Sequence, residues 1–483
     1  MTDFKNLDIS TAKEYLQKKE FSSLELTKFF IDRIEKSDLN CFITKTFEDA
    51  IHMAKESDKK ISRNEEIGIL EGIPIGMKDL FCTKGVRTTA GSKILENFVP
   101  FYESTVSENL LSDGAVILGK TNMDEFAMGS ANTTSFFGNV INPLKSGGEK
   151  NKNLVPGGSS GGSASSVAAN LCMAATGSDT GGSIRQPASF CGLVGLKPSY
   201  GRCSRFGMIA FASSLDQAGP ITKTVKDAAI VLQSMSSYDA KDSTSSRKSI
   251  PQYLDFLNFD IKGKKIGLPT EYKVEGLNSD IVRVWEDTEN LFKKNGAEIV
   301  NISLPHTSYA LPTYYIIAPA EASANLARYD GVKYGFREKS DDLEDMYELT
   351  RAKGFGDEVK RRLLIGTYVL SAGYYDAYYL KALKVRQLIS DDFKNAFEKC
   401  DLILTPTTPN VAFPIGEKQK DPIEMYLNDV LTVPASLAGL PAISVTAGKN
   451  SNNLPIGMQV IGRPFEEISV LAAGKLIEEC RGF

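Results

Sequence analysis

The sequence predicts a mixed α/β fold, in which helices cover both faces of a large β-sheet. Short apolar segments alternate along the chain with longer segments of helical apolar periodicity, which is typical of this class. Residues 265–269, 280–295 and 297–304 show the pattern strand, helix, strand, as in a βαβ unit. No internal repeat stands out, so a solenoid or a propeller is not expected.

The elements expected in the N-terminal half follow in order. Ser22-Ser23-Leu24-Glu25 fits a capping box at the start of a helix with an apolar stripe. Residues 73–77 predict a short buried strand, and the polar residue Lys78 follows them directly. After that, residues 105–112 predict a helix and residues 115–119 a strand.

In the C-terminal half, residues 356–400 are expected to be mostly helical and residues 401–406 to form a strand. Residues 455–462 and 466–479 predict a closing strand and helix. Between the halves, residues 239–250 are rich in Asp, Ser and Lys, so they are the best candidate for a linker or surface loop.

Residues 157–219 hold most of the dense glycine and serine clusters of the chain. Apolar blocks at 171–175 and 192–196 interrupt these clusters, whereas a disordered linker lacks such blocks. We therefore expect strands, tight loops and helix starts here. Glycine in such loops lets the backbone approach a neighbour closely, because it has no Cβ atom.

Composition excludes several classes of function. The chain has 56 Lys and Arg against 60 Asp and Glu, and a net charge of -4 argues against broad nucleic-acid binding. The two histidines, His52 and His306, lie far apart and outside any HExxH pattern, and the chain has no CxxC pair. We therefore expect neither a metal site nor a Ser-His-Asp triad. A serine enzyme with this sequence would need another base.

The cysteines and the apolar segments indicate a cytoplasmic protein. The seven cysteines are scattered and most have apolar neighbours, as expected for reduced thiols in a core. Residues 1–18 lack the apolar region of a signal peptide. No apolar run is long enough to predict a membrane-spanning helix.

Two motifs place serines among glycines. They are Gly157-Gly158-Ser159-Ser160-Gly161-Gly162-Ser163 and Gly177-Ser178-Asp179-Thr180-Gly181-Gly182-Ser183-Ile184-Arg185. The first lacks the Gly-Lys-Ser/Thr ending of a P-loop, and both a nucleotide loop and a structural turn remain alternatives to a catalytic role. The second follows an expected strand at 171–176. The N–H groups of Thr180, Gly181 and Gly182 would converge there into an anion hole beside Ser183.

A serine nucleophile needs a base, and Lys78 is the candidate. It follows the apolar run 73–77, so burial is expected. Desolvation lowers the pKa of a lysine from its ordinary value of about 10.4. The residues alone leave a second interpretation open, in which Lys78 is a surface lysine paired with Asp79.

Residues 157–197, together with Gly76-Met77-Lys78-Asp79, resemble the amidase signature family. The resemblance implies the amidase signature fold as a single domain over residues 1–483. It divides into a helical segment of about residues 1–65, a core of about 66–235, and a part of about 250–483 that completes the sheet and the glutamine pocket.

The resemblance also implies the catalytic roles. Ser183 would be the nucleophile, Ser159 the bridging serine and Lys78 the base. The N–H groups of residues 180–183 would form the oxyanion hole. The peptide bond between Gly158 and Ser159 would be cis.

Further motifs make the resemblance closest to the glutaminase subunits of tRNA-dependent amidotransferases. They lie at residues 87–95, 121–130, 320–331 and 373–379. The chain departs from the usual pattern at Ala131-Asn132-Thr133-Thr134 and in a longer loop at 145–154. These departures leave the catalytic assignment intact.

A glutaminase must bind the α-carboxylate and the α-ammonium of its substrate. The resemblance implies that Arg362 binds the carboxylate and Asp429 the ammonium, with Tyr314 beside them. Arg361 is the alternative carboxylate ligand. Without the resemblance, each charged residue would be interpreted as part of an ordinary surface.

The implied activity is release of ammonia from glutamine for ATP-dependent conversion of Glu-tRNA(Gln) to Gln-tRNA(Gln). The B and C subunits would complete a heterotrimer, and the B subunit would make most contacts with tRNA and would use ATP and Mg²⁺. No cofactor is expected in this chain. The alternatives are a stand-alone amidase for small amides and, more remotely, a non-catalytic assembly scaffold.

Overall fold

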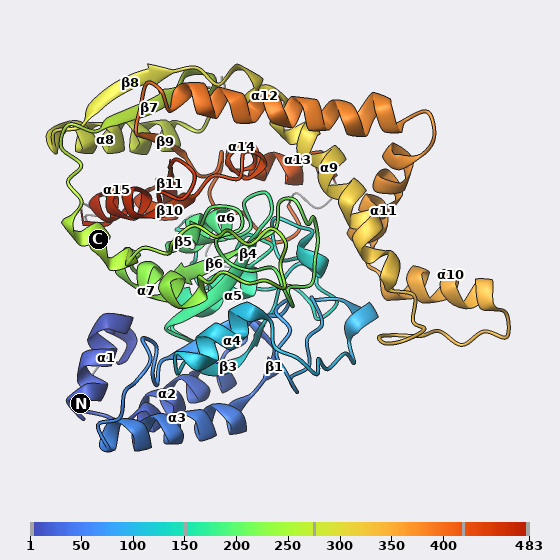
Figure 1. Cartoon of the computed structure of the whole chain (residues 1–483), viewed down its shortest axis with the longest axis horizontal. Coiled ribbons are helices and arrows are strands. Elements are labelled where there is room, and N and C mark those ends of the chain that lie inside the picture. Colours follow the sequence, from blue (N-terminus) through green and yellow to red (C-terminus); the bar gives the residue numbers. More distant parts are fainter. Residues whose placement is uncertain (1–3, 148–151, 274–276, 418–420, 480–483) are drawn as a thin grey trace.

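The computed structural model describes residues 4–147, 152–273, 277–417 and 421–479. Their strands form one 11-stranded sheet with the order β1-β3-β2-β4-β6-β5-β10-β11-β9-β7-β8 (Figure 1). The strands are β1 (Phe42–Lys45), β2 (Pro74–Lys78), β3 (Val116–Thr121), β4 (Ala174–Asp179), β5 (Val194–Lys197), β6 (Gln217–Thr222), β7 (Lys265–Pro269), β8 (Glu298–Ile302), β9 (Leu402–Pro406), β10 (Ala442–Lys449) and β11 (Pro455–Ile461).

The sheet is mixed, as predicted. β2 runs parallel to β3 and β4, and β7 runs parallel to β8 and β9. The other neighbouring strands pair antiparallel. Two parallel groups therefore lie toward the two ends of the sheet, and antiparallel strands join them.

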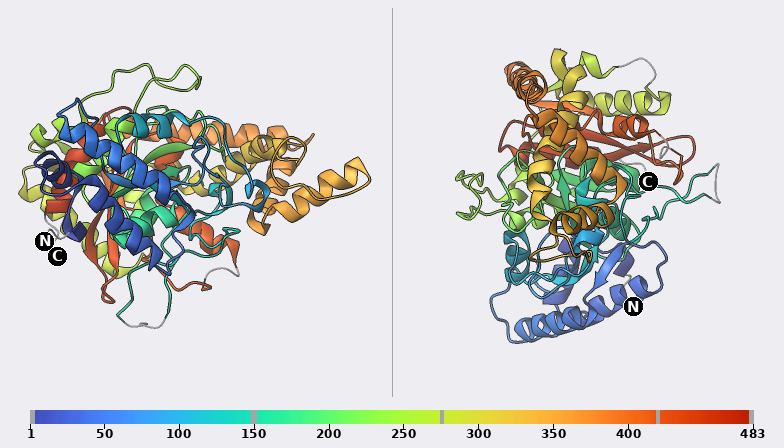
Figure 2. Two further views of the ribbon diagram at one scale, coloured as in Figure 1. Left: turned by 90° about the horizontal axis from the view of Figure 1, so that it is seen from below. Right: turned by 90° about the vertical axis from the view of Figure 1, so that its right-hand side faces the viewer.

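Helices surround this sheet (Figure 2). They are α1 (Ile9–Gln17), α2 (Ser23–Glu35), α3 (Phe47–Ser62), α4 (Thr105–Ser112), α5 (Gly161–Ala168), α6 (Arg185–Cys191), α7 (Val225–Met235), α8 (Ser279–Lys294), α9 (Ala310–Asn325), α10 (Leu343–Gly354), α11 (Asp357–Leu370), α12 (Lys381–Ala396), α13 (Pro422–Tyr426), α14 (Val433–Leu437) and α15 (Glu467–Glu479).

Helices cover both faces, which β10 and β11 show directly. A Cβ atom on Gly474 of α15 would meet the side chains of Ile443 and Val445 on β10. A Cβ atom on Gly457 of β11 would instead meet Ser189 of α6 and Ser444 of β10. Because neighbouring residues of a strand point to opposite faces, α15 and α6 lie on opposite sides of the sheet.

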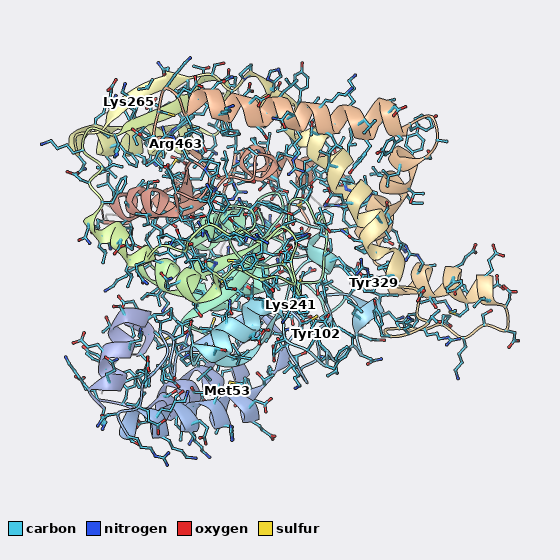
Figure 3. The ribbon with its side chains drawn as sticks, viewed as in Figure 1. Met53, Tyr102, Lys241, Lys265, Tyr329 and Arg463 are labelled. Carbon is cyan, nitrogen blue, oxygen red and sulfur yellow. The ribbon has the colours of Figure 1, made fainter. Side chains whose placement is uncertain are left out.

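Other helices extend the fold beyond the sheet. α1, α2 and α3 lie at the end formed by β1 and β3, and α9 packs against α11 on one side of the body (Figure 1). α10 projects from that side into solvent, as the left view of Figure 2 also shows. Met53 on α3 and Lys265 at the start of β7 mark opposite ends of the molecule (Figure 3).

Several sequence predictions are confirmed in detail. Ser22 and Glu25 form a reciprocal capping box at the start of α2. The segment 105–112 is α4, and β7, α8 and β8 form the predicted βαβ unit. The closing strand and helix are β11 and α15.

The strand expected at 171–176 is displaced. The observed strand is β4 (Ala174–Asp179), and residues 171–173 form a bend before it. The apolar residues of 171–173 are buried, but the strand itself continues through Gly177, Ser178 and Asp179. This displacement carries β4 to the edge of the sheet where the polar residues gather.

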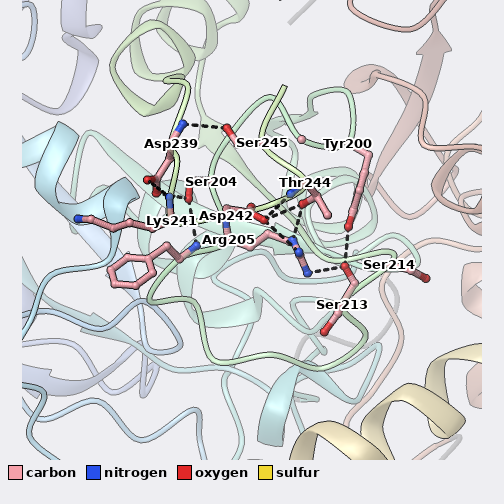
Figure 4. A network of polar contacts seen from close by, with 12 residues as sticks. Tyr200, Ser204, Arg205, Ser213, Ser214, Asp239, Lys241, Asp242, Thr244 and Ser245 are labelled. Atoms are coloured by element: carbon pink, nitrogen blue, oxygen red, sulfur yellow. Dashed lines mark hydrogen bonds and ion pairs between the residues drawn. The ribbon is translucent and has the colours of Figure 1, made fainter. Parts of the chain in front are cut away.

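Residues 239–250 form a surface loop between α7 and a short 3-10 helix at Tyr253–Asn258. The loop folds back onto residues 204 and 205 (Figure 4). The hydroxyl of Ser204 donates to Asp239 at 2.7 Å, and Arg205 forms an ion pair with Asp242 at 3.1 Å. Within the longer loop at 145–154, residues 148–151 lie outside the described part of the chain.

The cysteine prediction is confirmed for the described cysteines. Cys41, Cys82, Cys172, Cys191, Cys203 and Cys400 are free and buried. Cys480 lies outside the described residues. None of the described helices is long and apolar enough to cross a membrane.

Candidate active site

Three parallel strands bring the site together. β3, β2 and β4 are neighbours that run in the same direction, so their carboxyl ends meet at one edge of the sheet. Lys78 is the last residue of β2, Asp179 is the last residue of β4, and Asp124 follows β3. Polar residues at or just after the ends of three strands thus become one cluster.

Lys78 lies among three serine hydroxyls. Its Nζ donates to the Oγ of Ser159 at 2.9 Å, of Ser160 at 2.8 Å and of Ser178 at 2.8 Å. Of these serines, only Ser159 was predicted to act in the chemistry. Ser160 and Ser178 stand in the same two glycine-framed motifs, which is the signal that could have found them.

Burial dominates the electrostatics of Lys78. It lowers the pKa of Lys78 to about 7, although the carboxylates of Asp124, Asp179 and Asp216 act in the opposite direction. A lysine with this pKa is partly neutral at pH 7, so it has a lone pair that can accept a proton.

The interpretation of Lys78 as a surface lysine paired with Asp79 is wrong. The Lys78 side chain has no exposed surface. Asp79 instead accepts hydrogen bonds from the backbone N–H and the hydroxyl of Thr89. The strand 74–78 is buried along its whole length, and its last side chain is therefore buried as well.

Ser160 gives the lysine a preferred direction for proton transfer. Its hydroxyl donates to the carbonyl of Ser178 at 3.3 Å, so its Oγ can only accept from Lys78. A neutral lysine has two N–H donors, and Ser160 accepts one of them. Its lone pair can then accept from the hydroxyl of Ser159 or Ser178, but not from that of Ser160.

The loop after β4 carries Ser183 and a set of unused backbone donors. The N–H groups of Thr180, Gly181, Gly182 and Ser183 donate no hydrogen bond to any other described residue. Gly182 has a φ of +150°, and a Cβ atom there would collide with the side chain of Thr432. Unpaired N–H groups beside a nucleophile are what an oxyanion hole requires.

An ion pair behind this loop fixes its shape. Arg185 donates from Nε and Nη2 to the two carboxylate oxygens of Asp179, each at 2.9 Å, and both side chains are fully buried. Nη1 of Arg185 also donates to the carbonyl of Thr432 at 3.0 Å. Thr432 in turn donates to the carbonyl of Gly181 at 2.6 Å. The guanidinium of Arg185 thereby holds Asp179 directly and Gly181 through Thr432.

The first serine motif meets the second at Ser160 and Ser183. The N–H of Ser160 donates to the carbonyl of Ser183 at 3.3 Å. The Gly158–Ser159 peptide bond is cis, as the family resemblance implied. The N–H of Gly158 donates to the side chain of Gln186 at 2.9 Å. The structure thus brings Lys78, Ser159 and Ser183 into one region.

Arg362 lines a cavity of about 310 Å³ together with Asp124, Ser130 and its neighbour Arg361. Its Nε donates to Glu358 at 2.8 Å, and its guanidinium contacts the rings of Phe211, Tyr315 and Tyr426 at 5.5, 5.2 and 5.4 Å from their centroids. Its two terminal nitrogens donate to no other described residue. A buried guanidinium with two free nitrogens suits a carboxylate ligand.

The structure separates Arg362 from the alternative, Arg361. The Arg362 side chain is 3% exposed, whereas the Arg361 side chain is 44% exposed. Both contact Glu358, but only Arg362 has an aromatic wall around it. The geometry therefore favours Arg362.

Asp429 and Tyr314 connect this cavity with the oxyanion loop, Asp429 through Ser130 and Tyr314 through Gly181. Asp429 accepts a hydrogen bond from Ser130, which also lines the cavity. Burial raises the pKa of Asp429 to about 7, against the effects of Ser130 and Arg362. A Cβ atom on Gly181 would lie 2.8 Å from the Tyr314 ring, so this ring covers the oxyanion loop.

Neither histidine takes part in this site. Nδ1 of His306 lies 2.9 Å from the carboxylate of Asp392, which is on α12. His52 lies on α3. In the described part of the chain, no group of three or more His, Cys, Asp or Glu residues could hold a metal ion.

The family model for amidases matches residues 25–471 of this sequence. The chain belongs to the amidase family.

Two curated relatives show how similar other members of the family are. The A subunit of the glutamyl-tRNA(Gln) amidotransferase of Azorhizobium caulinodans is 59% identical, and the match covers 100% of this chain and 98% of that protein. The A subunit of the same amidotransferase from Pelagibacter ubique is also 59% identical, over 99% of this chain and 97% of that protein.

Solved amidase structures share the fold. The A subunit of the glutamyl-tRNA(Gln) amidotransferase of Thermotoga maritima is 40% identical with a TM-score of 0.81, over 100% of this chain and 96% of that chain. The peptide amidase of Stenotrophomonas maltophilia is 29% identical with a TM-score of 0.82, over 98% and 96%.

Proposed function

We propose that this chain is the glutaminase subunit of a tRNA-dependent amidotransferase. It hydrolyses glutamine and releases ammonia for the conversion of Glu-tRNA(Gln) to Gln-tRNA(Gln). The observation that carries this proposal is the buried contact between Lys78 and Ser159, next to a loop with free N–H groups at Ser183. The two relatives that are 59% identical to this chain support the specific activity.

The chemistry is a proton relay. Neutral Lys78 takes the proton of Ser159, which takes the proton of Ser183 as that serine attacks the amide carbon of glutamine. The N–H groups of Thr180, Gly181 and Gly182 stabilise the negative charge on the carbonyl oxygen. The relay then runs in reverse and protonates the amide nitrogen, which leaves as ammonia when the C–N bond breaks. Water hydrolyses the acyl-enzyme that remains on Ser183 and restores the serine.

The pocket selects glutamine through its two charged groups. The α-carboxylate binds the free nitrogens of Arg362, and the α-ammonium binds Asp429. The ring of Tyr314 covers the oxyanion loop at Gly181. A substrate that lacks either charge would leave a buried group unpaired, which costs binding free energy.

The B and C subunits complete the enzyme in this proposal. The B subunit makes most of the contacts with Glu-tRNA(Gln) and uses ATP and Mg²⁺, which suits the net charge of -4 on this chain. This chain needs no cofactor of its own. The assembly works in the cytoplasm.

Co-purification with candidate B and C subunits tests the proposal. The complex should hydrolyse glutamine, and Glu-tRNA should raise that rate. Full activity of the chain alone on small amides would favour the stand-alone amidase. Absence of hydrolysis under both conditions would favour the scaffold and contradict the proposal.

A further inference from the structure

Asp216 is a buried carboxylate close to the site, and the relay does not use it. It immediately precedes β6 and is 2% exposed. Burial raises its pKa to about 6, so it is ionised at pH 7.5. As a carboxylate it only accepts hydrogen bonds, and three donors point at it.

One oxygen of Asp216 binds the oxyanion loop. Its Oδ1 accepts from the hydroxyl of Thr180 at 2.7 Å. Thr180 is the first residue after β4 and precedes Gly181, whose free N–H belongs to the proposed oxyanion hole. The Asp179–Arg185 pair fixes the loop on one side, and Asp216 fixes its start on the other.

The other oxygen binds a wall of the substrate pocket. Oδ2 of Asp216 accepts from the N–H of Phe211 at 2.8 Å and of Ala212 at 3.0 Å. The Phe211 ring lies under the guanidinium of Arg362, 5.5 Å from its centroid, and edge-on to Tyr314 at 6.5 Å. The same carboxylate therefore binds both the oxyanion loop and the segment that packs against Arg362.

We infer that Asp216 is a positioning residue that keeps the oxyanion loop and the carboxylate end of the glutamine pocket in register. This inference rests on the proposed function. Asp216 itself contacts no reacting atom. An amide in its place carries no charge and has only one acceptor oxygen, so the hydrogen bonds to the loop and to the Phe211 segment would both become weaker.

Two variants of the complex separate the attachments. Thr180→Val removes only the loop attachment, and we expect kcat for glutamine hydrolysis to fall about tenfold with KM unchanged. Asp216→Asn loosens both sides, so kcat should fall at least as far and KM should rise about tenfold. The double variant should lose less kcat than the product of the two single losses, because both changes act on the same hydrogen bond between Thr180 and Asp216.

Asp242→Asn is the matched control. Asp242 is 7% exposed and accepts from the N–H groups of Arg205 at 2.8 Å and Thr244 at 3.0 Å. It makes the same kind of loop contact in the neighbouring loop shown in Figure 4. It contacts neither Thr180 nor Phe211. Its kcat and KM should equal those of the unchanged complex.

Three outcomes would overturn the inference, and the first two concern glutamine hydrolysis. One is wild-type kinetics in Asp216→Asn. The other is multiplicative loss in the double variant. The third concerns amidation with ammonia, which should persist in every variant. If Thr180→Val, the milder change, loses both glutaminase activity and ammonia-dependent amidation, the effects are only structural and the inference fails. If the unchanged complex hydrolyses no glutamine, the proposed function fails instead.

Discussion

At the scale of single residues, the surroundings of Lys78 support its proposed role as the base. Lys78 has no exposed surface, and three serine oxygens lie within 2.9 Å of its Nζ. Burial brings its pKa to about 7, although three carboxylates oppose that shift. The neutral amine is therefore available near physiological pH without a histidine.

The pKa of Lys78 predicts the pH dependence of kcat. A lysine with a lowered pKa is neutral above that value and protonated below it, so the base is lost as the pH falls through about 7. We expect kcat for glutamine hydrolysis to fall about tenfold per pH unit below this point. A kcat that stays constant between pH 6 and pH 8 would exclude Lys78 as the base.

Asp429 predicts a separate pH dependence, in KM. Its pKa is raised to about 7, so below that pH it is protonated and cannot pair with the α-ammonium of glutamine. KM for glutamine should rise as the pH falls, and Asp429→Asn should raise KM about 10- to 100-fold at pH 8 but much less at pH 6, where the wild-type carboxyl is already protonated. Measurement of KM from pH 6 to pH 8 checks this. An unchanged KM in Asp429→Asn would remove Asp429 from the ammonium site.

The adjacent arginines provide a matched pair of variants. Arg362→Ala should raise KM for glutamine about 10- to 100-fold, because a buried charge-assisted contact with the carboxylate is lost. Arg361→Ala should leave KM unchanged, since that side chain is 44% exposed. The reverse result in steady-state kinetics would assign the carboxylate to Arg361.

At the scale of elements, the sequence predicts those with a strong local signal. The capping box of α2 and the βαβ unit of β7, α8 and β8 are predicted within one or two residues. The bounds of β4 and the existence of β6 are not predicted from the sequence, because Gly177, Gly219 and Pro220 disfavour a strand locally. Close packing explains these glycines, since a Cβ atom on Gly219 would collide with the carbonyl of Leu196.

The capping box predicts a local effect on stability. Ser22 Oγ accepts from the N–H of Glu25 at 3.1 Å, and Ser22→Ala should cost the first turn of α2 about 1 kcal/mol. Amide hydrogen exchange in that turn should become about fivefold faster. Ser62→Ala is the control, because its hydroxyl bonds only within the exposed end of α3. Unchanged exchange in Ser22→Ala would show that the box does not stabilise the helix.

At the scale of the whole molecule, the site depends on contacts that join distant segments. The sequence motifs supplied Lys78, Ser159 and Ser183, because each stands in a recognisable local pattern. Asp216 was not found from the sequence, since its role depends on a contact with Thr180, 36 positions earlier in the chain. Long-range contacts of this kind leave no local signal.

Replacement of both histidines tests whether the chemistry depends on a histidine anywhere in the molecule. His306 contacts Asp392, and His52 lies on α3, both away from the relay. The double variant His52→Gln, His306→Asn should keep the wild-type kcat in a glutaminase assay. A loss of kcat in a folded double variant would mean that a histidine takes part in the chemistry.

The most direct measurement of the central claim uses Ser183→Ala in the complete complex. The claim is that ammonia for amidation comes from glutamine through Ser183. Amidation of Glu-tRNA(Gln) should stop with glutamine as the nitrogen source and continue at the wild-type rate with ammonium chloride. Continued amidation from glutamine would contradict the claim.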